Sequence, residues 1–151
     1  MLKISSDSAK KTKETAQFLA EKVFKKPSGD SALVIALSGD LGAGKTTFIQ
    51  GFLKMAGVKK RITSPTFVIF KRFKINDLKF KNIYHVDCYR LNKPAEILKL
   101  GFKEIINNPQ NIILIEWAEK IKNILPKKII RIKFDYGKKE NERKIEVISH
   151  L

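Results

Sequence analysis

The sequence is short of several features that mark extracellular and membrane proteins. Cys88 is the only cysteine among 151 residues, which excludes an intramolecular disulfide and a zinc site built on several cysteines. No apolar run approaches the roughly 18 residues that a membrane helix requires, and residues 1–13 are polar, unlike a secretory signal. We therefore expect a soluble, cytoplasmic protein in which residues 1–151 form a single domain.

Acidic residues are scarce relative to basic ones. The chain has 15 Asp and Glu against 31 Lys and Arg, which gives a formal net charge of +16. This charge favours polyanionic partners, although a lysine-rich composition would also leave a merely solvated surface. The excess is concentrated between residues 58 and 81, where Asp77 is the only acidic residue. The basic residues of this segment are Lys59, Lys60, Arg61, Lys71, Arg72, Lys74, Lys79 and Lys81.

Helical and buried-strand patterns alternate along the first part of the chain. Ser8 is a candidate N-cap for a helix that ends before Pro27. The unbroken apolar runs at 32–37 and 112–115 are typical of strands that are buried on both faces of a sheet. A further helix follows the first of these runs and extends to about Met55.

Other segments predict antiparallel hairpins. The β-rich runs 67–75 and 79–87 flank a short polar turn, and the alternating runs 129–134 and 144–148 flank a charged one. Between these hairpins, a short helix is expected from Pro94 through Ile106. Strands with helical crossovers, together with hairpins, predict a mixed sheet between layers of helices.

Residues 39–46 read GDLGAGKT, a full match to two glycines separated by four residues and followed by Lys and Ser or Thr. The glycines let backbone N–H groups approach phosphate oxygens at a helix N-terminus. Lys45 supplies a positive charge for the β- and γ-phosphates, and Thr46 supplies a hydroxyl for Mg²⁺. The alternative is a glycine-rich turn without a ligand. The residues expected to contact ATP here are Gly39, Asp40, Leu41, Gly42, Ala43, Gly44, Lys45, Thr46 and Thr47.

This motif, between a buried strand and a helix, sharpens the expected fold class. We predict an α/β fold, a P-loop NTPase-like three-layer sandwich with a mixed central sheet that carries antiparallel hairpins. A site of this kind also needs a carboxylate at a strand end to hold Mg²⁺ or its water. Asp87 ends the run IYHVD and Glu116 ends IILIE, so both are candidate metal and catalytic residues. The run IILIE is the better match to a strand buried in a parallel sheet, so Glu116 is expected to lie beside the glycine-rich loop, whereas Asp87 ends a more mixed strand. Each could instead be a structural cap.

Two further segments are candidates for contact with the nucleotide. Ser64 and Thr66 lie on either side of Pro65, in a segment that could sense a γ-phosphate or be an ordinary turn. Trp117 directly follows Glu116 and is either a core-edge aromatic residue or part of a mobile switch.

Three residues with reactive side chains show no catalytic or metal-binding pattern. Cys88 is expected to be a small packed residue, because only His85 lies near it as a conceivable base. His85 and His150 do not have the spacing of metal ligands.

Several segments occur in the order and spacing of one known family. They are GDLGAGKTTFIQGFL, SPTF, YHVDCYRL, LGFKEI, LIEWAEKI and the LP that follows it. On these segments the sequence resembles the TsaE family, small bacterial ATPases needed to make the threonylcarbamoyladenosine of tRNA. The resemblance covers essentially the whole chain. One departure is the run VIFKRFK after SPTF, which is more basic than is usual in the family.

The resemblance implies roles for the candidate residues. Lys45 and Thr46 would bind phosphate and Mg²⁺, Glu116 would complete the metal site, and Asp87 would be needed for hydrolysis. The family's first switch would contain Ser64 and Thr66, and its second switch would contain Trp117. The partner subunits implied are TsaB and TsaD, which carry the transferase chemistry. Contact with tRNA would be mainly through them.

The expected function is therefore Mg²⁺-dependent ATP binding and hydrolysis for this tRNA modification. No arginine finger is assignable from the sequence, so hydrolysis is expected to be slow without partners. One alternative is a small-molecule P-loop kinase, although 151 residues leave no dedicated acceptor segment. Another is a basic nucleic-acid-binding module, which would not require GDLGAGKT.

Overall fold

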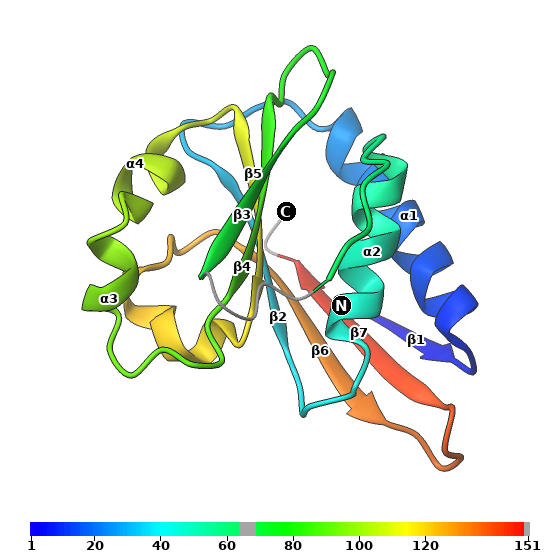
Figure 1. Ribbon diagram of the computed structural model, residues 1–151. Coiled ribbons are helices and arrows are strands. Elements are labelled where there is room, and N and C mark those ends of the chain that lie inside the picture. Colours follow the sequence, from blue (N-terminus) through cyan, green and yellow to red (C-terminus); the bar gives the residue numbers. More distant parts are fainter. Residues whose placement is uncertain (64–68, 150–151) are drawn as a thin grey trace.

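Two adjacent strands at the centre of the sheet come from the unbroken apolar runs. A computed structural model describes residues 1–63 and 69–149, and Figure 1 shows its helices and strands. β2 (Leu33–Ser38) and β5 (Asn111–Glu116) run parallel, with Val34 opposite Ile113. Apart from the two ends of β2, their residues are buried. The prediction of strands covered on both faces is confirmed.

The described residues form one seven-stranded sheet in the order β1-β7-β6-β2-β5-β4-β3. The outer strands are β1 (Leu2–Ser6), β3 (Phe70–Lys74), β4 (Asn82–Asp87), β6 (Ile130–Tyr136) and β7 (Arg143–Ser149). β4 and β6 are parallel to the central pair, whereas β3 and β7 are antiparallel to their neighbours. The carboxyl ends of β1, β2, β4, β5 and β6 therefore meet at one end of the sheet, which we call the carboxyl end. The opposite end is the amino end.

Helices cover both faces of the sheet (Figure 1). α1 (Ala9–Lys25) and α2 (Lys45–Met55) pack on one face, where Phe48 and Phe52 are fully buried. α3 (Ala95–Leu98), α4 (Phe102–Asn107) and the 3-10 helix η1 (Ala118–Ile124) pack on the other. This arrangement confirms the predicted α/β class with three layers and a mixed sheet.

One half of the sheet is covered by helices on a single face. In β6, Ile130, Ile132 and Phe134 are buried, whereas Arg131 and Lys133 are exposed. Because successive side chains of a strand point to opposite faces, this alternation means that the second face of β6 meets solvent. The predicted hairpin of β6 and β7 is confirmed by their antiparallel pairing.

The helix predictions are confirmed at α1 and at α2, which ends at Met55 as expected, and are wrong in part at residues 94–106. Ser8 caps α1, since its Oγ accepts a hydrogen bond of 3.2 Å from the backbone N–H of Lys11. The single helix predicted from Pro94 through Ile106 is instead α3 and α4. Gly101 lies between them with a φ of 80°, and a left-handed residue cannot continue a right-handed helix. None of the described helices is long and apolar enough to cross a membrane.

The first predicted hairpin forms, but its strands are shorter than expected. β3 begins at Phe70, and residues 67–68 of the predicted run lie outside the described residues. β4 begins at Asn82 because Asp77 Oδ1 accepts the backbone N–H groups of Lys79 and Phe80 at 2.8 and 2.9 Å. Such a carboxylate-centred turn takes those donors out of the strand ladder. β1 has no counterpart among the predicted elements.

Candidate functional site

The glycine-rich loop joins the carboxyl end of β2 to the start of α2. Its first glycine, Gly39, has a φ of 141°, and a Cβ there would lie 2.5 Å from the carbonyl oxygen of Phe134 on β6. Gly44 has a φ of 107° and offers no side-chain cap to α2. The N–H groups of the first helical turn are therefore free to bind an anion held in the loop.

Lys45 is folded back into this loop. It is only 5% exposed, and its Nζ donates hydrogen bonds to the carbonyl oxygens of Gly39 and, at 2.9 Å, Asp40. The same Nζ lies 4.4 Å from the centroid of the Trp117 ring. Burial lowers the pKa of Lys45, and nearby carboxylates, of which Glu116 acts most strongly, oppose that shift. A cation is therefore held at the position where phosphate charge would stabilise it.

Glu116, the last residue of β5, contacts both α2 and β4. The Thr46 hydroxyl donates to Glu116 Oε1 at 2.8 Å, and His85 Nε2 lies 2.7 Å from Glu116 Oε2. Asp87 ends β4 directly opposite Glu116 in the parallel register, and its Oδ1 accepts the backbone N–H of Tyr89 at 2.9 Å. The predicted placement of Glu116 beside the loop is confirmed by these contacts.

Trp117 occupies a strained backbone position between β5 and η1. Its φ of 57° is the only positive value among described non-glycine residues. A bulky residue in this region costs free energy and is held there by surrounding contacts. The half-buried ring packs against Tyr89 at a centroid distance of 5.2 Å, and the Tyr89 carbonyl accepts a hydrogen bond from Lys120.

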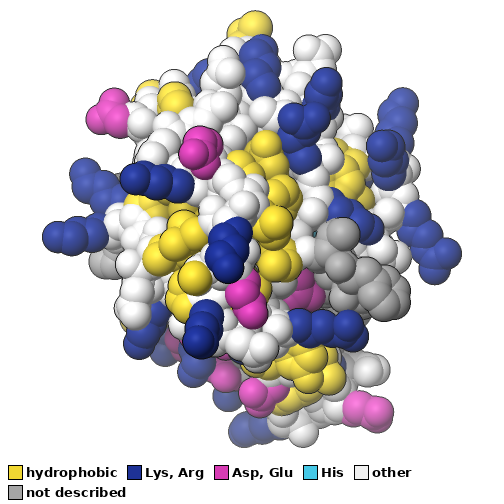
Figure 2. All heavy atoms as spheres, turned by 60° about the vertical axis from the view of Figure 1, so that its left-hand side comes forward, with side chains coloured by type: hydrophobic (Ala, Val, Ile, Leu, Met, Phe, Trp, Pro, Cys, Tyr) yellow, Lys and Arg dark blue, Asp and Glu magenta, His cyan; other side chains and the backbone are white. Residues whose placement is uncertain are grey.

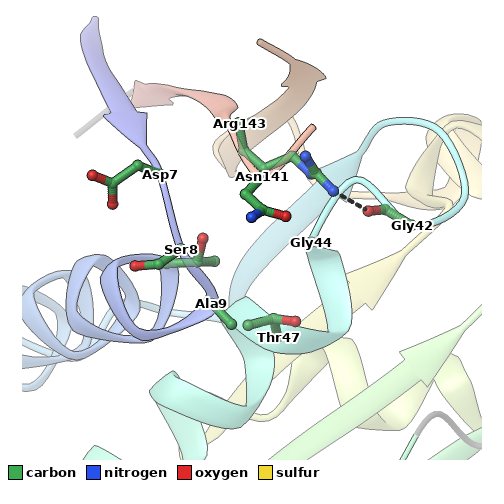
Figure 3. Close-up of a pocket in the computed structure, with 9 residues that line it drawn as sticks. Asp7, Ser8, Ala9, Gly42, Gly44, Thr47, Asn141 and Arg143 are labelled. Atoms are coloured by element: carbon green, nitrogen blue, oxygen red, sulfur yellow. Dashed lines mark hydrogen bonds between the residues drawn. The ribbon is translucent and has the colours of Figure 1, made fainter. Parts of the chain in front are cut away.

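A cavity of about 370 Å³ opens on the other side of the loop (Figure 3). It lies between the start of α1 and the turn that joins β6 to β7, so its walls come from both ends of the chain. Arg143 borders it and donates to the carbonyl of Gly42 at 3.3 Å. The lining residues are Asp7, Ser8, Ala9, Thr12, Gly42, Gly44, Thr47, Asn141 and Arg143.

The β6–β7 hairpin also fixes the tip of the loop. The Tyr136 hydroxyl donates to the carbonyl of Leu41, and the Arg143 guanidinium lies 4.7 Å from the centroid of the Tyr136 ring. Leu41 itself is 71% exposed. The loop is thus held by the hairpin on one side and by the contacts of Lys45 and Thr46 on the other.

The structure brings most, but not all, of the sequence candidates together. Lys45, Thr46, Glu116 and Trp117 form one cluster, and Asp87 borders it through its pairing with Glu116. Thr47 lines the cavity instead. The predicted contacts of Ser64 and Thr66 concern residues outside those described.

Cys88 and the histidines complete the account of the candidates. Cys88 is fully buried, and this burial raises the pKa of its thiol to about 12, in agreement with a packed rather than a nucleophilic residue. His150 lies outside the described residues. The absence of metal-ligand spacing around His85 gives no indication of its contact with Glu116, which is not among the predictions. The position of His85 two residues before Asp87, on the same face of β4, was the available signal.

The sheet, the glycine-rich loop and the lysine at the start of α2 define an α/β protein of the P-loop class. A family model described as "Threonylcarbamoyl adenosine biosynthesis protein TsaE" matches residues 6–145. The chain therefore belongs to the TsaE family, which places it among the tRNA threonylcarbamoyladenosine biosynthesis proteins.

Individual relatives agree with this membership. The chain is 39% identical over 140 residues to the TsaE protein of Rickettsia felis, covering 92% of this chain and 75% of the relative. It is 39% identical over 131 residues to TsaE of Bacillus subtilis, covering 87% and 75%. The crystal structure of Bacillus subtilis YdiB matches with a TM-score of 0.76 and 31% identity, over 98% of this chain and 84% of that one.

Proposed function

We propose that the chain binds ATP and Mg²⁺ at the carboxyl end of the sheet and hydrolyses the ATP for tRNA threonylcarbamoyladenosine modification in the cytoplasm. The hydrogen bond of 2.8 Å between Thr46 and Glu116 carries the proposal. It joins the hydroxyl that follows the loop lysine to a buried carboxylate on the neighbouring strand. In nucleotide-hydrolysing proteins with this loop, a hydroxyl and a strand-end carboxylate together hold Mg²⁺.

The side chains present fit a magnesium ion that is shared with phosphate. Mg²⁺ commonly binds through one or two carboxylates, with water and substrate phosphates as further ligands. Thr46, Glu116 and Asp87 offer oxygen donors of this kind. Within residues 1–63 and 69–149, no group of three or more His, Cys, Asp or Glu side chains could hold a metal by itself. When bound, Mg²⁺ would neutralise charge on the phosphates.

We assign the two ends of ATP to the two sides of the loop. β5, which carries Glu116, lies on one side of β2, and the β6–β7 hairpin lies on the other. Thr46 contacts Glu116, whereas Thr47 lines the cavity beside that hairpin. The proposed position of the γ-phosphate is therefore near Glu116, and that of the nucleoside is in the cavity, where Asn141 supplies a hydrogen-bonding amide.

The loop would support attack of water on the γ-phosphate. Backbone N–H groups at the start of α2 and the Lys45 ammonium stabilise negative charge on the phosphoryl oxygens. Asp87, beside Glu116, is the candidate to orient the attacking water. Arg143 is not placed to stabilise charge on the γ-phosphate, because it donates its hydrogen bonds to the carbonyls of Gly42, Glu140 and Glu142, on the nucleoside side of the loop. Slow hydrolysis without partners is the consequence we propose, with TsaB- and TsaD-type subunits completing the active site.

A cavity-filling variant tests the nucleotide site directly. Ala9 is exposed and lines the cavity, so Ala9→Phe places a ring in the proposed nucleoside site. We expect ATP affinity, measured by calorimetry with Mg²⁺, to fall about tenfold, a cost of about 1.4 kcal/mol. Binding of inorganic tripolyphosphate should not change. Lys10→Phe, at the adjacent exposed position outside the cavity, is the matched control.

The outcomes separate the parts of the proposal. Wild-type protein that fails to bind ATP would contradict the proposed function as a whole. Equal loss of ATP and tripolyphosphate binding in Ala9→Phe would contradict the assignment of the cavity to the nucleoside. Phosphate release that stays at the background rate after addition of TsaB and TsaD subunits would contradict the hydrolytic role.

A further inference from the structure

Both oxygens of the Glu116 carboxylate are held by groups from different elements. Oε1 accepts the Thr46 hydroxyl from α2, and Oε2 lies 2.7 Å from Nε2 of His85 on β4. The Glu116 side chain is 5% exposed and that of His85 is 0% exposed. Few water molecules can reach either group, so their mutual contact replaces hydration of the carboxylate.

The stability of the fold alone does not explain a histidine at position 85. Its side chain is buried on the α1 and α2 face of the sheet, where neighbouring positions Ile83, Ile112 and Leu114 are apolar. Its Nδ1 has no hydrogen-bond partner among the described residues. A buried polar nitrogen without a partner costs about 1–3 kcal/mol, and an apolar side chain would avoid that cost. The contact that offsets it is the one with Glu116.

The register of the sheet explains why this contact fixes the direction of the carboxylate. His85 is paired with Leu114, and Asp87 is paired with Glu116, two residues further along both strands. His85 therefore lies two residues nearer the amino end of the sheet than the two carboxylates. His85 and Glu116 are diagonal neighbours on adjacent parallel strands, and their side chains meet at 2.7 Å. The imidazole contacts Glu116 from the amino-end side, while Thr46 contacts it from the loop side.

We propose that His85 is a positioning residue that orients Glu116 toward the magnesium ion of bound ATP. His85 does not touch the nucleotide and acts through the Oε2 contact. This inference rests on the proposed function, because it assigns a role within the same site. Groups that hold a metal-binding carboxylate typically change metal affinity by 10–100-fold when they are removed.

Two substitutions of His85 separate orientation from packing. In His85→Gln, the side-chain amide places an N–H near the position of Nε2, whereas His85→Leu fills the space without a donor. We measure ATP affinity at a series of Mg²⁺ concentrations and again in excess EDTA. His85→Leu should need 10–100-fold more Mg²⁺ for half-maximal affinity, with EDTA affinity unchanged. His85→Gln should stay within about threefold of wild type.

A double-mutant cycle tests whether His85 acts only through Glu116. In the Glu116→Gln background, His85→Leu should have no further effect on the Mg²⁺ requirement. A full effect in that background, or equal effects of the Leu and Gln variants, would overturn the inference. So would a His85→Leu protein with the wild-type Mg²⁺ requirement. Thermal unfolding without nucleotide confirms that each variant is folded. If His85→Leu does not fold, His85→Asn replaces it, because the shorter amide does not reach the position of Nε2, and the same 10–100-fold increase in the Mg²⁺ requirement is expected.

The proposed function and this inference fail in different ways. If wild-type protein does not bind ATP, or binds it equally with and without Mg²⁺, both are overturned. If wild-type binding depends on Mg²⁺ and the dependence is unaltered in His85→Leu, the inference alone is overturned.

Discussion

The two ends of the sheet use lysine in opposite ways. At the carboxyl end, Lys45 is the first residue of α2, and its Nζ donates to two loop carbonyls. At the amino end, the Nζ of Lys79 donates to the carbonyls of Phe24 and Lys26, where α1 ends. A helix N-terminus disfavours a cation and a helix C-terminus favours one. The position of Lys79 therefore stabilises the fold, whereas the position of Lys45 destabilises it.

Burial sharpens the contrast. Lys45 is nearly inaccessible and its pKa is lowered by that burial, whereas Lys79 is half-buried. A residue that is retained at such a cost is expected to have a ligand whose charge compensates it. The comparison predicts that substitutions at the carboxyl end change ligand binding, and that those at the amino end change stability.

The largest effect is expected from Lys45→Ala. Loss of charge-assisted hydrogen bonds to phosphate, at about 1.5–3 kcal/mol each, should weaken ATP binding by about 100-fold or more. The free energy of unfolding, measured with urea, should be unchanged or slightly raised. Titration with a fluorescent ATP analogue measures the affinity, and Lys79→Met is the matched control. Wild-type affinity in Lys45→Ala would remove the basis of the comparison.

The two carboxylates should fail differently. Glu116→Gln should raise the Mg²⁺ concentration needed for tight ATP binding, because Glu116 contacts Thr46. Asp87→Asn should leave ATP affinity within about threefold of wild type and abolish phosphate release in the presence of partner subunits. The direction follows from Asp87 lying beside Glu116, at the strand end. Normal phosphate release by both variants would show that neither carboxylate has its assigned role.

The sequence was sufficient for the parts of the site that are continuous in the chain. The run ALVIAL, the loop GDLGAGKT and the helix after it lie within 24 residues, and their order alone predicts where phosphate binds. The run IILIE identified the partner strand because a strand buried on both faces must lie near the centre of the sheet. Glu116 could therefore be placed beside the loop before any contact was known.

The other parts of the site could not be predicted, because they depend on strand register and on strands with few apolar residues. The contact between His85 and Glu116 requires knowing that β4 and β5 are adjacent and aligned at Asp87. The cavity requires β1 to lie beside β7, but in β1 only Ser6 is buried and Ile4 half-buried. The apolar residues of β1 are Leu2 and Ile4 alone, and Leu2 is exposed, so the alternation is too short to predict a strand.

At the amino end, Lys79→Met should reduce stability without affecting ATP. Removal of a cation that binds two carbonyls at the end of α1 should cost about 1 kcal/mol, or about 2–4 °C in Tm. Thermal unfolding followed by circular dichroism measures the shift. Lys59→Met, at an exposed position, is the control and should change Tm by less than about 1 °C. Weaker ATP binding in Lys79→Met would break the division between the two ends.

The smallest effect on tRNA binding is expected at the basic edge strand. Lys71, Arg72 and Lys74 are all exposed on β3, the last strand of the sheet (Figure 1). On the face of the molecule shown in Figure 2, lysine and arginine side chains are scattered rather than confined to one patch. We expect reversal of these three charges to Glu to leave tRNA affinity of the complex with TsaB and TsaD, and its salt dependence, unchanged.

The geometry of β3 is the reason for this expectation. Phe73 packs toward α1 and α2, and Phe70 packs toward the opposite layer, so Lys71 faces away from the side of Arg72 and Lys74. One nucleic-acid strand would have to wrap around the edge to meet all three. Charges on an exposed edge strand also have a different use, because they prevent pairing with the edge of another molecule.

That use predicts different results for neutral and reversed variants. Replacement of the three residues by Thr should promote self-association, measured by light scattering over a range of protein concentrations, because an uncharged edge can pair. Replacement by Glu should not, since the edge stays charged. If β3 instead contacts tRNA, the Glu variant should lose more tRNA affinity than the Thr variant. Three lost phosphate contacts would flatten the slope of log affinity against log salt by about 2–3, most clearly in the Glu variant. A flatter slope without self-association of the Thr variant would assign β3 to nucleic acid and extend ligand binding beyond the carboxyl end of the sheet.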